Sequence, residues 1–389
     1  MDGGERVAII GGGVVGALAA WFLREEGFAG PVTVIEQDPT YRFASTARSA
    51  ASIRAQFSCP INVEIALFGA TFLRQVRERI GPEAEIGLVE NGYLILCSEA
   101  AADERRAALS MQRRLGADIE LMAPEHLAAR YPWLSRQGVS FATFGVSGEG
   151  WFDAWTLLQS ARTAARGRGV TFVHAKAIGL QLRQGRVTGV ALSDGAVIEA
   201  DWCINAAGPL AGSVAAWIGA DLPVEPRKRT VFSFKAPLTA PGMPMLFDLS
   251  GAWVRPEGDG FIGGIQPPPA ADPPAWGDFE PDHELFEDRF WPILAERVPP
   301  FEQLRLTGAW AGHYEMNLLD HNGVVGPHPD IPNFLFANGF SGHGVMQAPG
   351  VARGLAELIT GGGYRSLDLS PLGFERIAAG RPLVEAAIY

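Results

Sequence analysis

The chain has 389 residues, of which 47% are hydrophobic and 19% are charged, a composition typical of a globular protein with a large core. Its formal net charge of −11 and isoelectric point near 5.2 disfavour nucleic acid and anionic membrane surfaces as partners. Three scattered cysteines, Cys59, Cys97 and Cys203, contain no CxxC pair and indicate a reducing compartment without a disulfide framework or an iron–sulfur site.

The length of the chain bounds its organisation. It exceeds the roughly 250–300 residues at which a single core stops growing, so we expect two closely connected domains. No apolar run reaches the ~20 residues that a membrane-spanning helix needs. The apolar N-terminus lacks a basic flank and contains glycines, unlike a secretory signal. These features predict a cytoplasmic protein with no transmembrane segment.

The first 36 residues hold the densest pattern in the chain. An apolar run at 6–10 precedes the sequence GGGVVG, an amphipathic segment follows at 14–26, and a second apolar run occupies 32–36. This order predicts strand, tight turn, helix and strand, as in units that bind dinucleotides. The unpaired N–H groups and the dipole at the start of such a helix favour bound phosphate.

Each glycine of this pattern has a separate role. Gly11 permits a turn without a Cβ, Gly13 lets the backbone approach a pyrophosphate, and Gly16 lets the helix pack on the strand. Glu36 ends the second strand 20 residues after Gly16. A carboxylate there accepts hydrogen bonds from an adenosine ribose and repels a 2′-phosphate, so the pattern disfavours NADP.

Residues 37–58 form a polar stretch that is too rich in Ser, Thr and Arg for an idle linker. Ser45 and Thr46 offer hydroxyl groups near phosphates, and Arg54 offers a planar fork that can bind both oxygens of a carboxylate. The alternative interpretation is that Arg54 and the two other arginines of this stretch are solvated surface residues.

The next segment carries no residue that looks catalytic, and we interpret it as the start of a second domain. Residues 62–80, 100–115 and 122–131 have the pattern of helices, and residues 88–97 have the pattern of a hairpin that turns at Asn91-Gly92.

Residues 148–222 return to the nucleotide-binding unit. Asp153 is placed to cap a helix that runs to residue 166. An apolar strand at 201–206 runs into Ala207 and Gly208, where a second backbone segment could approach a dinucleotide. Further strands are expected at 170–174, 177–182, 187–192 and 196–198.

Residues 223–306 are rich in proline and aromatic residues and predict an antiparallel sheet that roofs a substrate site. The segment 266–274 is expected to be a surface loop, because its prolines cannot pair in a central sheet. Residues 280–298 are expected to be helical. The expected strands lie at 231–234, 245–248, 252–255 and 260–265.

The C-terminal part repeats the order of strand, glycine-rich loop and helix. A strand is expected at 334–337, a loop at 338–344, and a helix at 348–359 with Pro349 in its first turn. Backbone N–H groups at this helix start would face a ligand that gains negative charge. The histidines of this part match no metal-ligand spacing, so we predict no metal site. They are His313, His321, His328 and His343.

Taken together and in order, these motifs resemble the FAD-dependent amine and amino-acid oxidoreductases of the D-amino-acid-oxidase and sarcosine-oxidase superfamily. The chain is similar to the subgroup that contains the beta chain of heterotetrameric sarcosine oxidase, dimethylglycine-dehydrogenase-like proteins and a mitochondrial flavoprotein linked to respiratory complex I assembly. The resemblance covers nearly the whole chain. The motifs are GGGVVG with Glu36, STARSAASIR, EGWFD, INAAGPLAG, GHYEMNLLDHNGVVGPHP and FANGFSGHGVMQAPG.

The resemblance implies an α/β protein, α+β overall, with a Rossmann-type FAD-binding domain and an antiparallel-sheet substrate domain. The implied FAD-binding domain is discontinuous and comprises residues 1–85, 146–222 and 305–389. Residues 86–145 and 223–304 form the implied substrate-binding domain.

The resemblance also implies FAD as a non-covalent cofactor and assigns residues to it. The ADP half would contact Gly11, Gly13, Gly16 and Glu36, with Gln37 beside them. Ser45, Thr46 and Arg48 would lie along the phosphates and ribityl chain, Ala177 near the adenine, and Ala207 and Gly208 near the pyrophosphate. The pyrimidine edge of the flavin would contact Gly339, Phe340, Gly342, His343, Gly344, Val345 and Met346.

For the substrate, the resemblance implies that Arg54 binds a carboxylate. Tyr314 would form a wall of the pocket, and Gln266 and His343 would be polar contacts.

Three departures from the family pattern bear on the reaction. Gly312 stands where monomeric sarcosine oxidases attach the flavin to a cysteine, so that linkage cannot form. Met346 replaces a lysine that assists carboxylate binding, and a lysine associated with oxygen reactivity aligns with about Ile262. A dehydrogenase that passes electrons to a quinone or a carrier protein is therefore at least as well supported as an oxidase.

The implied reaction is hydride transfer to flavin N5 from the carbon next to an amine nitrogen, which leaves an imine that water hydrolyses. The implied substrate is an amino acid or secondary amine with a carboxylate, such as an N-substituted glycine or a D-amino acid.

Two alternatives to this reaction remain open. One is an FAD-dependent 2-hydroxy-acid dehydrogenase, which needs a histidine base over the ring. The other is a flavoprotein that acts in respiratory-complex assembly or electron delivery, and either a homo- or a hetero-oligomer is compatible with the sequence.

Overall fold

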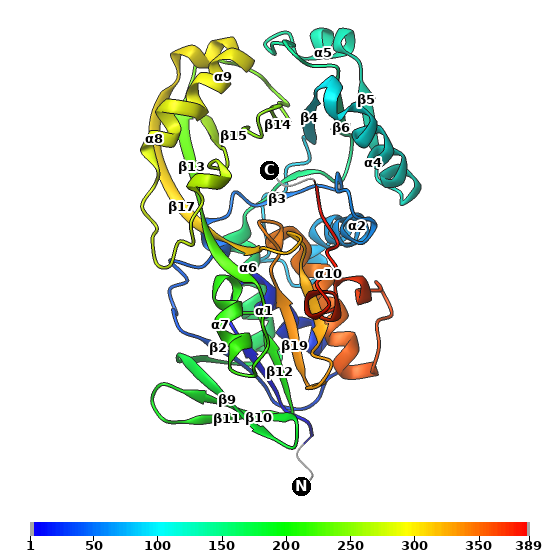
Figure 1. The fold of residues 1–389 in the computed structure, drawn as a ribbon, viewed down its shortest axis with the longest axis vertical. Helices are drawn as coiled ribbons and strands as arrows, with labels where there is room; N and C mark the ends of the chain where they lie inside the picture. Colours follow the sequence, from blue (N-terminus) through cyan, green and yellow to red (C-terminus); the bar gives the residue numbers. More distant parts are fainter. Residues whose placement is uncertain (1–3, 387–389) are drawn as a thin grey trace.

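The computed structural model describes residues 4–386, and its strands form two large sheets that are bridged by helices (Figure 1). The first sheet has six strands in the order β18-β19-β12-β1-β2-β8. β1 (Val7–Ile10) lies at its centre, parallel to β2 (Val32–Glu36) on one side and to β12 (Trp202–Asn205) on the other. The outer strands are β8 (Thr171–His174), β19 (Phe334–Asn338) and the antiparallel β18 (Val324–Pro327).

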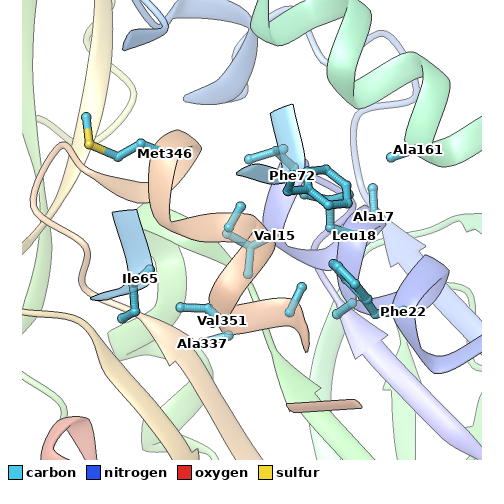
Figure 2. Close-up of a cluster of buried hydrophobic side chains, with 14 of the residues drawn as sticks. Val15, Ala17, Leu18, Phe22, Ile65, Phe72, Ala161, Ala337, Met346 and Val351 are labelled. Carbon is cyan, nitrogen blue, oxygen red and sulfur yellow. The ribbon is translucent and has the colours of Figure 1, made fainter. Parts of the chain in front are cut away.

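Helices cover one face of this sheet around α1 (Val14–Glu25), which is buried along most of its length. α6 (Ala154–Gly167) and α10 (Gly344–Gly361) pack against α1, and α2 (Pro60–Arg74) packs on α10. Figure 2 shows Leu18 and Phe22 of α1 close to Phe72 of α2, with Val351 of α10 nearby. Burial of each large side chain of this kind stabilises the fold by about 1.5–3 kcal/mol, so these contacts anchor both glycine-rich loops to one core.

The second sheet has eight strands in the order β17-β13-β16-β15-β14-β4-β6-β5. Its neighbours are antiparallel except for β14 and β4, which run parallel. Two long strands, β13 (Val224–Lys235) and β17 (Arg305–Asn317), pair along most of their length and extend toward the first sheet. The others are β16 (Gly260–Gly264), β15 (Trp253–Glu257), β14 (Met245–Phe247), β4 (Tyr93–Cys97), β6 (Phe141–Gly145) and β5 (Ile119–Met122).

The remaining elements are small. A two-stranded sheet joins β3 (Ser52–Ile53) to β7 (Gly150–Trp151), and a three-stranded meander contains β9 (Ala177–Arg183), β10 (Arg186–Leu192) and β11 (Val197–Glu199). The other helices are α3 (Val76–Arg79), α4 (Ala102–Arg114), α5 (Pro124–Arg130), α7 (Ala211–Ala216), α8 (His283–Leu285), α9 (Trp291–Arg297) and α11 (Glu375–Ala378). No helix in residues 4–386 is long and apolar enough to cross a membrane.

The structure confirms the predicted fold class and the opening order of strand, turn, helix and strand. It also confirms the cap at Asp153, whose side chain accepts hydrogen bonds from the N–H groups of Trp155 and Thr156. The prediction that residues 223–304 contribute to an antiparallel sheet is correct. The division of the chain into two domains stays a prediction; β17, which was expected in the FAD-binding part, pairs with β13 of the other sheet.

Two local predictions are wrong, and two strands were missed. Residues 88–97 form no hairpin, because Val89 pairs with Trp151 while β4 pairs with β14 and β6. The strands β5 and β6 were not expected. The last long helix begins at Gly344 instead of residue 348, so Pro349 lies inside it. For the strands, pairing with a distant segment outweighs the local pattern.

The close packing of α1 on β1 predicts that a methyl group added at Gly16 lowers the stability of the protein. A Cβ on Gly16 would lie 2.0 Å from the carbonyl oxygen of Gly11, a contact that only a backbone shift can relieve. Gly16→Ala is therefore expected to destabilise the protein by about 1–3 kcal/mol, as overpacking does, with a lower urea midpoint and weaker FAD retention. The matched control is Gly167→Ala in α6, where a Cβ meets no atom within 4 Å and stability should stay equal or rise. Equal unfolding curves for the two variants would contradict the assigned contact.

Candidate active site

A cavity of about 680 Å³ runs between the two sheets. Its volume lies within the ~300–1,000 Å³ that is usual for ligand sites. The lining begins at Glu36 and Ala177, passes the start of α1, and reaches Arg54 and Tyr314 under the eight-stranded sheet. The cavity therefore connects the nucleotide-binding unit to the predicted roof.

At the end of the cavity near Glu36, glycine residues let the backbone lie close to the cavity. Gly11 has a φ of +101°, and a Cβ there would lie 2.2 Å from the carbonyl oxygen of Ala206 at the end of β12. Glu36 is fixed by hydrogen bonds to its two oxygens from the N–H groups of Gly12 and Asp38, each at 2.8 Å. A Cβ on Gly13 would meet only the Thr46 hydroxyl, at 3.5 Å, so this position leaves room for a phosphate to approach.

The middle of the cavity is walled by residues 43–52. The Thr46 hydroxyl accepts a hydrogen bond from the N–H of Val14 in the first turn of α1. Ser45 donates to the carbonyl of His313 at 2.7 Å. Arg48 donates to the carbonyls of Arg42 and Ala311, so its guanidinium ties this wall to β17 as well as lining the cavity.

Opposite this wall, the start of α10 lines the cavity through Gly344, Val345 and Met346. The first N–H groups of a helix lack intrahelical partners, which makes this end favourable for a ligand oxygen with negative charge. Gly342 precedes it with a φ of +99°, and a Cβ there would lie 2.3 Å from the Tyr314 ring. Glycine therefore lets the loop pack flat on Tyr314.

The structure brings the four predicted substrate residues to one region of the cavity. Arg54 is only 2% exposed, and its guanidinium donates to the Gln56 carbonyl and lies 3.0 Å from Nε2 of His343. Burial and the adjacent guanidinium hold the pKa of His343 far below its usual range, so the ring is neutral. Tyr314 and Gln266 line the same cavity.

An apolar wall in this region was not foreseen from the sequence. Tyr93 and Phe247 stack with ring centroids 5.3 Å apart, and Met245, Trp253 and Ile265 line the cavity beside them. Tyr93 belongs to a segment that was expected to carry no functional residue. The missed signal is the parallel pairing of β4 with β14, which joins residues far apart in the sequence.

Two buried carboxyl groups also went undetected as parts of the site. Burial raises the pKa of Glu149 to about 7, and this side chain accepts hydrogen bonds from the N–H of Ala55 and from Gln56 Nε2, directly behind Arg54. Burial likewise raises the pKa of Glu315 to about 8; it lines the cavity and accepts from the N–H of Gly339. Carboxyl groups with raised pKa values are common at functional sites.

Most of the predicted cofactor residues line the cavity, but three do not. Gly16 packs against Gly11 within the α1 contact, Gly339 donates to Glu315, and Phe340 is buried in the core. The lining residues of the predicted set are Gly11, Gly13, Glu36, Gln37, Ser45, Thr46, Arg48, Ala177, Ala207, Gly208, Gly342, His343, Gly344, Val345 and Met346. The roles assigned to all of them stay predictions. Within residues 4–386 no group of three or more His, Cys, Asp or Glu side chains could hold a metal ion.

A helix start that suits a pyrophosphate, a carboxylate placed for a ribose and a long cavity under a second sheet define a class of protein, the two-part dinucleotide-dependent oxidoreductases. The family model described as FAD dependent oxidoreductase (DAO) matches residues 6–358, and the chain belongs to this family.

Relatives and solved structures agree with this assignment. The chain is 40% identical to the FAD-dependent oxidoreductase domain-containing protein 1 of Xenopus laevis, over 98% of this chain and 84% of that protein. It is 26% identical to the mitochondrial dimethylglycine dehydrogenase of Rattus norvegicus, over 91% of this chain and 43% of that protein. The L-proline dehydrogenase of P. horikoshii superposes with a TM-score of 0.83 at 25% identity, over 98% of this chain and 100% of that chain.

The protein is thus an FAD-dependent oxidoreductase, and the cavity fits the cofactor. Glycine leaves room beside the start of α1 where a pyrophosphate would bind, and the start of α10 lines the cavity, where it would stabilise negative charge on a bound flavin. The three cysteines are buried, and none lines the cavity, so no cysteine is placed to attach the flavin. When bound, the cofactor supplies hydride and electron transfer, and the chain supplies position and electrostatics.

The raised pKa of Glu149 predicts a pH-dependent stability. Its pKa rises from 4.5 in the unfolded chain to about 7 in the folded protein, so the folded state holds a proton that the unfolded state releases. The stability from this proton is present below about pH 4.5 and is lost as the pH rises through about 7, with a slope of at most about 1.4 kcal/mol per pH unit. Glu149→Gln should remove this part of the slope in urea unfolding of the FAD-loaded protein, whereas exposed Glu125→Gln should keep it. An unchanged slope in Glu149→Gln would contradict the burial of a protonated carboxyl group.

Proposed function

We propose that the protein oxidises the C–N bond of an amino acid or secondary amine that carries a carboxylate. The observation that carries this proposal is the buried guanidinium of Arg54 at the inner part of the FAD cavity, beside Tyr314 and His343. A buried cation favours an anionic ligand, and the arginine fork matches a carboxylate. The resemblance to dimethylglycine dehydrogenase and L-proline dehydrogenase supports an amine donor.

In this proposal the chain orients the substrate, and a bound FAD would supply the hydride acceptor. Arg54 holds the carboxylate, and the neutral His343 keeps the guanidinium in place by accepting a hydrogen bond from its Nη2–H group. The amine would enter uncharged, so no strong base is needed beside the transferred hydrogen. The start of α10 would stabilise the negative charge that reduction brings.

The alternative reaction, oxidation of a 2-hydroxy acid, needs a base to remove the hydroxyl proton. His343 is the histidine beside Arg54, and its lowered pKa makes it a weak base. His313 is engaged by the Asp278 carbonyl and stacks on Phe279, and burial lowers its pKa as well. These observations favour the amine. The polar substrate region likewise favours an enzyme over a protein that acts only in assembly of a respiratory complex or in electron delivery.

The apolar wall narrows the class of substrate that the cavity suits. Tyr93, Met245, Phe247 and Trp253 face the same cavity as Arg54, which suits a bulky apolar group on the nitrogen or the α-carbon. Glycine itself would leave this wall without contacts.

We also propose a cytoplasmic location, supported by three free cysteines.

Anaerobic bleaching of the flavin absorbance tests the proposed reaction. Wild-type protein should bleach with N-alkyl amino acids, D-amino acids or proline analogues, and not with 2-hydroxy acids. Arg54→Lys keeps the charge but loses the fork, so kcat/KM should fall roughly 10²–10³-fold, mainly through KM, while the flavin spectrum stays unchanged. Bleaching by hydroxy acids alone, or an Arg54→Lys variant with unchanged KM, would overturn the proposal.

Substrate size gives a separate prediction. Amines with a bulky apolar group should bleach the flavin more readily than glycine or sarcosine. Phe247→Ala removes part of the apolar wall and should lower kcat/KM for the bulky substrate by roughly 10–100-fold, with little effect on the smallest amine. Phe247→Leu keeps an apolar wall and should retain most of the activity. An equal fall of kcat/KM with the bulky and the smallest amines would contradict a role of the apolar wall in specificity.

A further inference from the structure

A second cavity, of about 520 Å³, lies on the other face of the wall formed by residues 46–51. Thr46, Ser49, Ala50 and Ala51 line both cavities, so a single backbone segment separates them. No part of the reaction described above uses this second cavity.

The shared wall lies beside the place that a flavin ring would occupy. The Thr46 hydroxyl accepts a hydrogen bond from the N–H of Val14 at the start of α1, where the pyrophosphate is expected. Arg54 lies in the proposed substrate region of the same cavity. The flavin ring would lie between these two points. Residues 49–51 connect them along the chain, and the same residues line the second cavity.

Contacts from behind hold this wall in place. Arg255 Nη2 donates to the carbonyl of Ala50, and Trp310 Nε1 donates to the carbonyl of Arg48. Ala51 has a φ of +46°, an unusual conformation for a residue other than glycine, and its carbonyl accepts from the N–H of Phe152. The wall is therefore a thin, well-supported partition and not a loose loop.

The lining of the second cavity is largely aromatic and apolar, and its charged residues are Arg255, Glu257 and Asp153. Trp155 is 42% exposed at the start of α6, which gives the cavity an opening to solvent. Arg255 lies 5.3 Å from the Trp151 ring and is paired with Glu257, so a positive charge faces the aromatic wall. The apolar lining residues are Ile86, Val89, Trp151, Phe152, Trp155, Ile262 and Trp310.

We propose that this second cavity binds a quinone that reoxidises the reduced flavin. Flat aromatic walls suit a planar ring, and Arg255, although paired with Glu257, contributes hydrogen-bond donors for quinone oxygens to the lining. Dioxygen would not need a cavity of this size, and a carrier protein could not enter it. The inference rests on the proposed function only in that the flavin must become reduced.

The reaction balances in two electrons and two protons. The reduced flavin gives up two electrons and one proton, a second proton comes from solvent, and the quinone becomes a hydroquinone while FAD returns to its oxidised form. Because the amine and the quinone occupy different cavities, the imine need not leave before the quinone binds.

The flavin can be reduced by light with a chemical electron donor, so the test does not need the unknown amine substrate. The photoreduced, FAD-loaded protein is mixed anaerobically with menadione or decylubiquinone, and the recovery of flavin absorbance is followed by stopped flow. The rate should saturate with quinone concentration. Trp155→Ala should raise the half-saturating concentration roughly tenfold, Trp155→Phe should restore it, and reoxidation by air should be the same in all three proteins. Because no amine is present, failure here would leave the proposed amine oxidation untouched.

The matched control is Trp291→Ala, which alters a similarly exposed tryptophan, 38% accessible, on α9, outside both cavities. It should behave as wild type. Three outcomes would overturn the proposal: a rate that rises linearly with quinone without saturation, an equal effect of Trp155→Ala and Trp291→Ala, or rapid reoxidation by air or a carrier protein with none by quinone.

Discussion

The close packing of the first turn of α1 against the ends of β1 and β12 is the contact on which the rest of the site depends. Gly11 and Gly16 leave no space for a Cβ, so the first turn of α1 lies directly against the strand ends beside the cavity. Thr46 bonds to the same turn, so the polar segment that follows β2 starts from a fixed point. From there the chain passes along the cavity to Arg54, which places the nucleotide end and the substrate end in one continuous space.

Buried charge is the second constraint. Arg54 is almost fully buried, and Glu149 lies behind it in a network with Gln56, whose carbonyl accepts from the guanidinium. Such a network is costly unless every polar group finds a partner, so it fixes side chains more tightly than apolar packing alone would. Burial, together with the same charge, lowers the pKa of His343 and keeps its ring neutral. In the proposed function this arrangement would supply an anion-binding position without a strong base beside it.

The eight-stranded sheet contributes residues to the lining of both cavities. One side of residues 46–51 faces the cavity with Arg54 and the stacked rings of Tyr93 and Phe247, and the other side faces a tryptophan-rich cavity with its own opening. A single thin partition thus separates two different chemical environments. This geometry fits an oxidoreductase whose electron donor and electron acceptor approach from different sides.

The sequence by itself determined the nucleotide-binding unit, because the glycine spacing, the apolar runs and Glu36 act over one short stretch of chain. It also pointed to Arg54, Tyr314, Gln266 and His343, which the fold brings to one cavity. Only the tertiary structure decided the pairing of β4 with β14, the apolar wall around Phe247, the burial that raises the pKa of Glu149, and the second cavity at Trp155. Each of these arises from contacts between segments far apart in the chain, and local patterns do not record long-range burial or pairing.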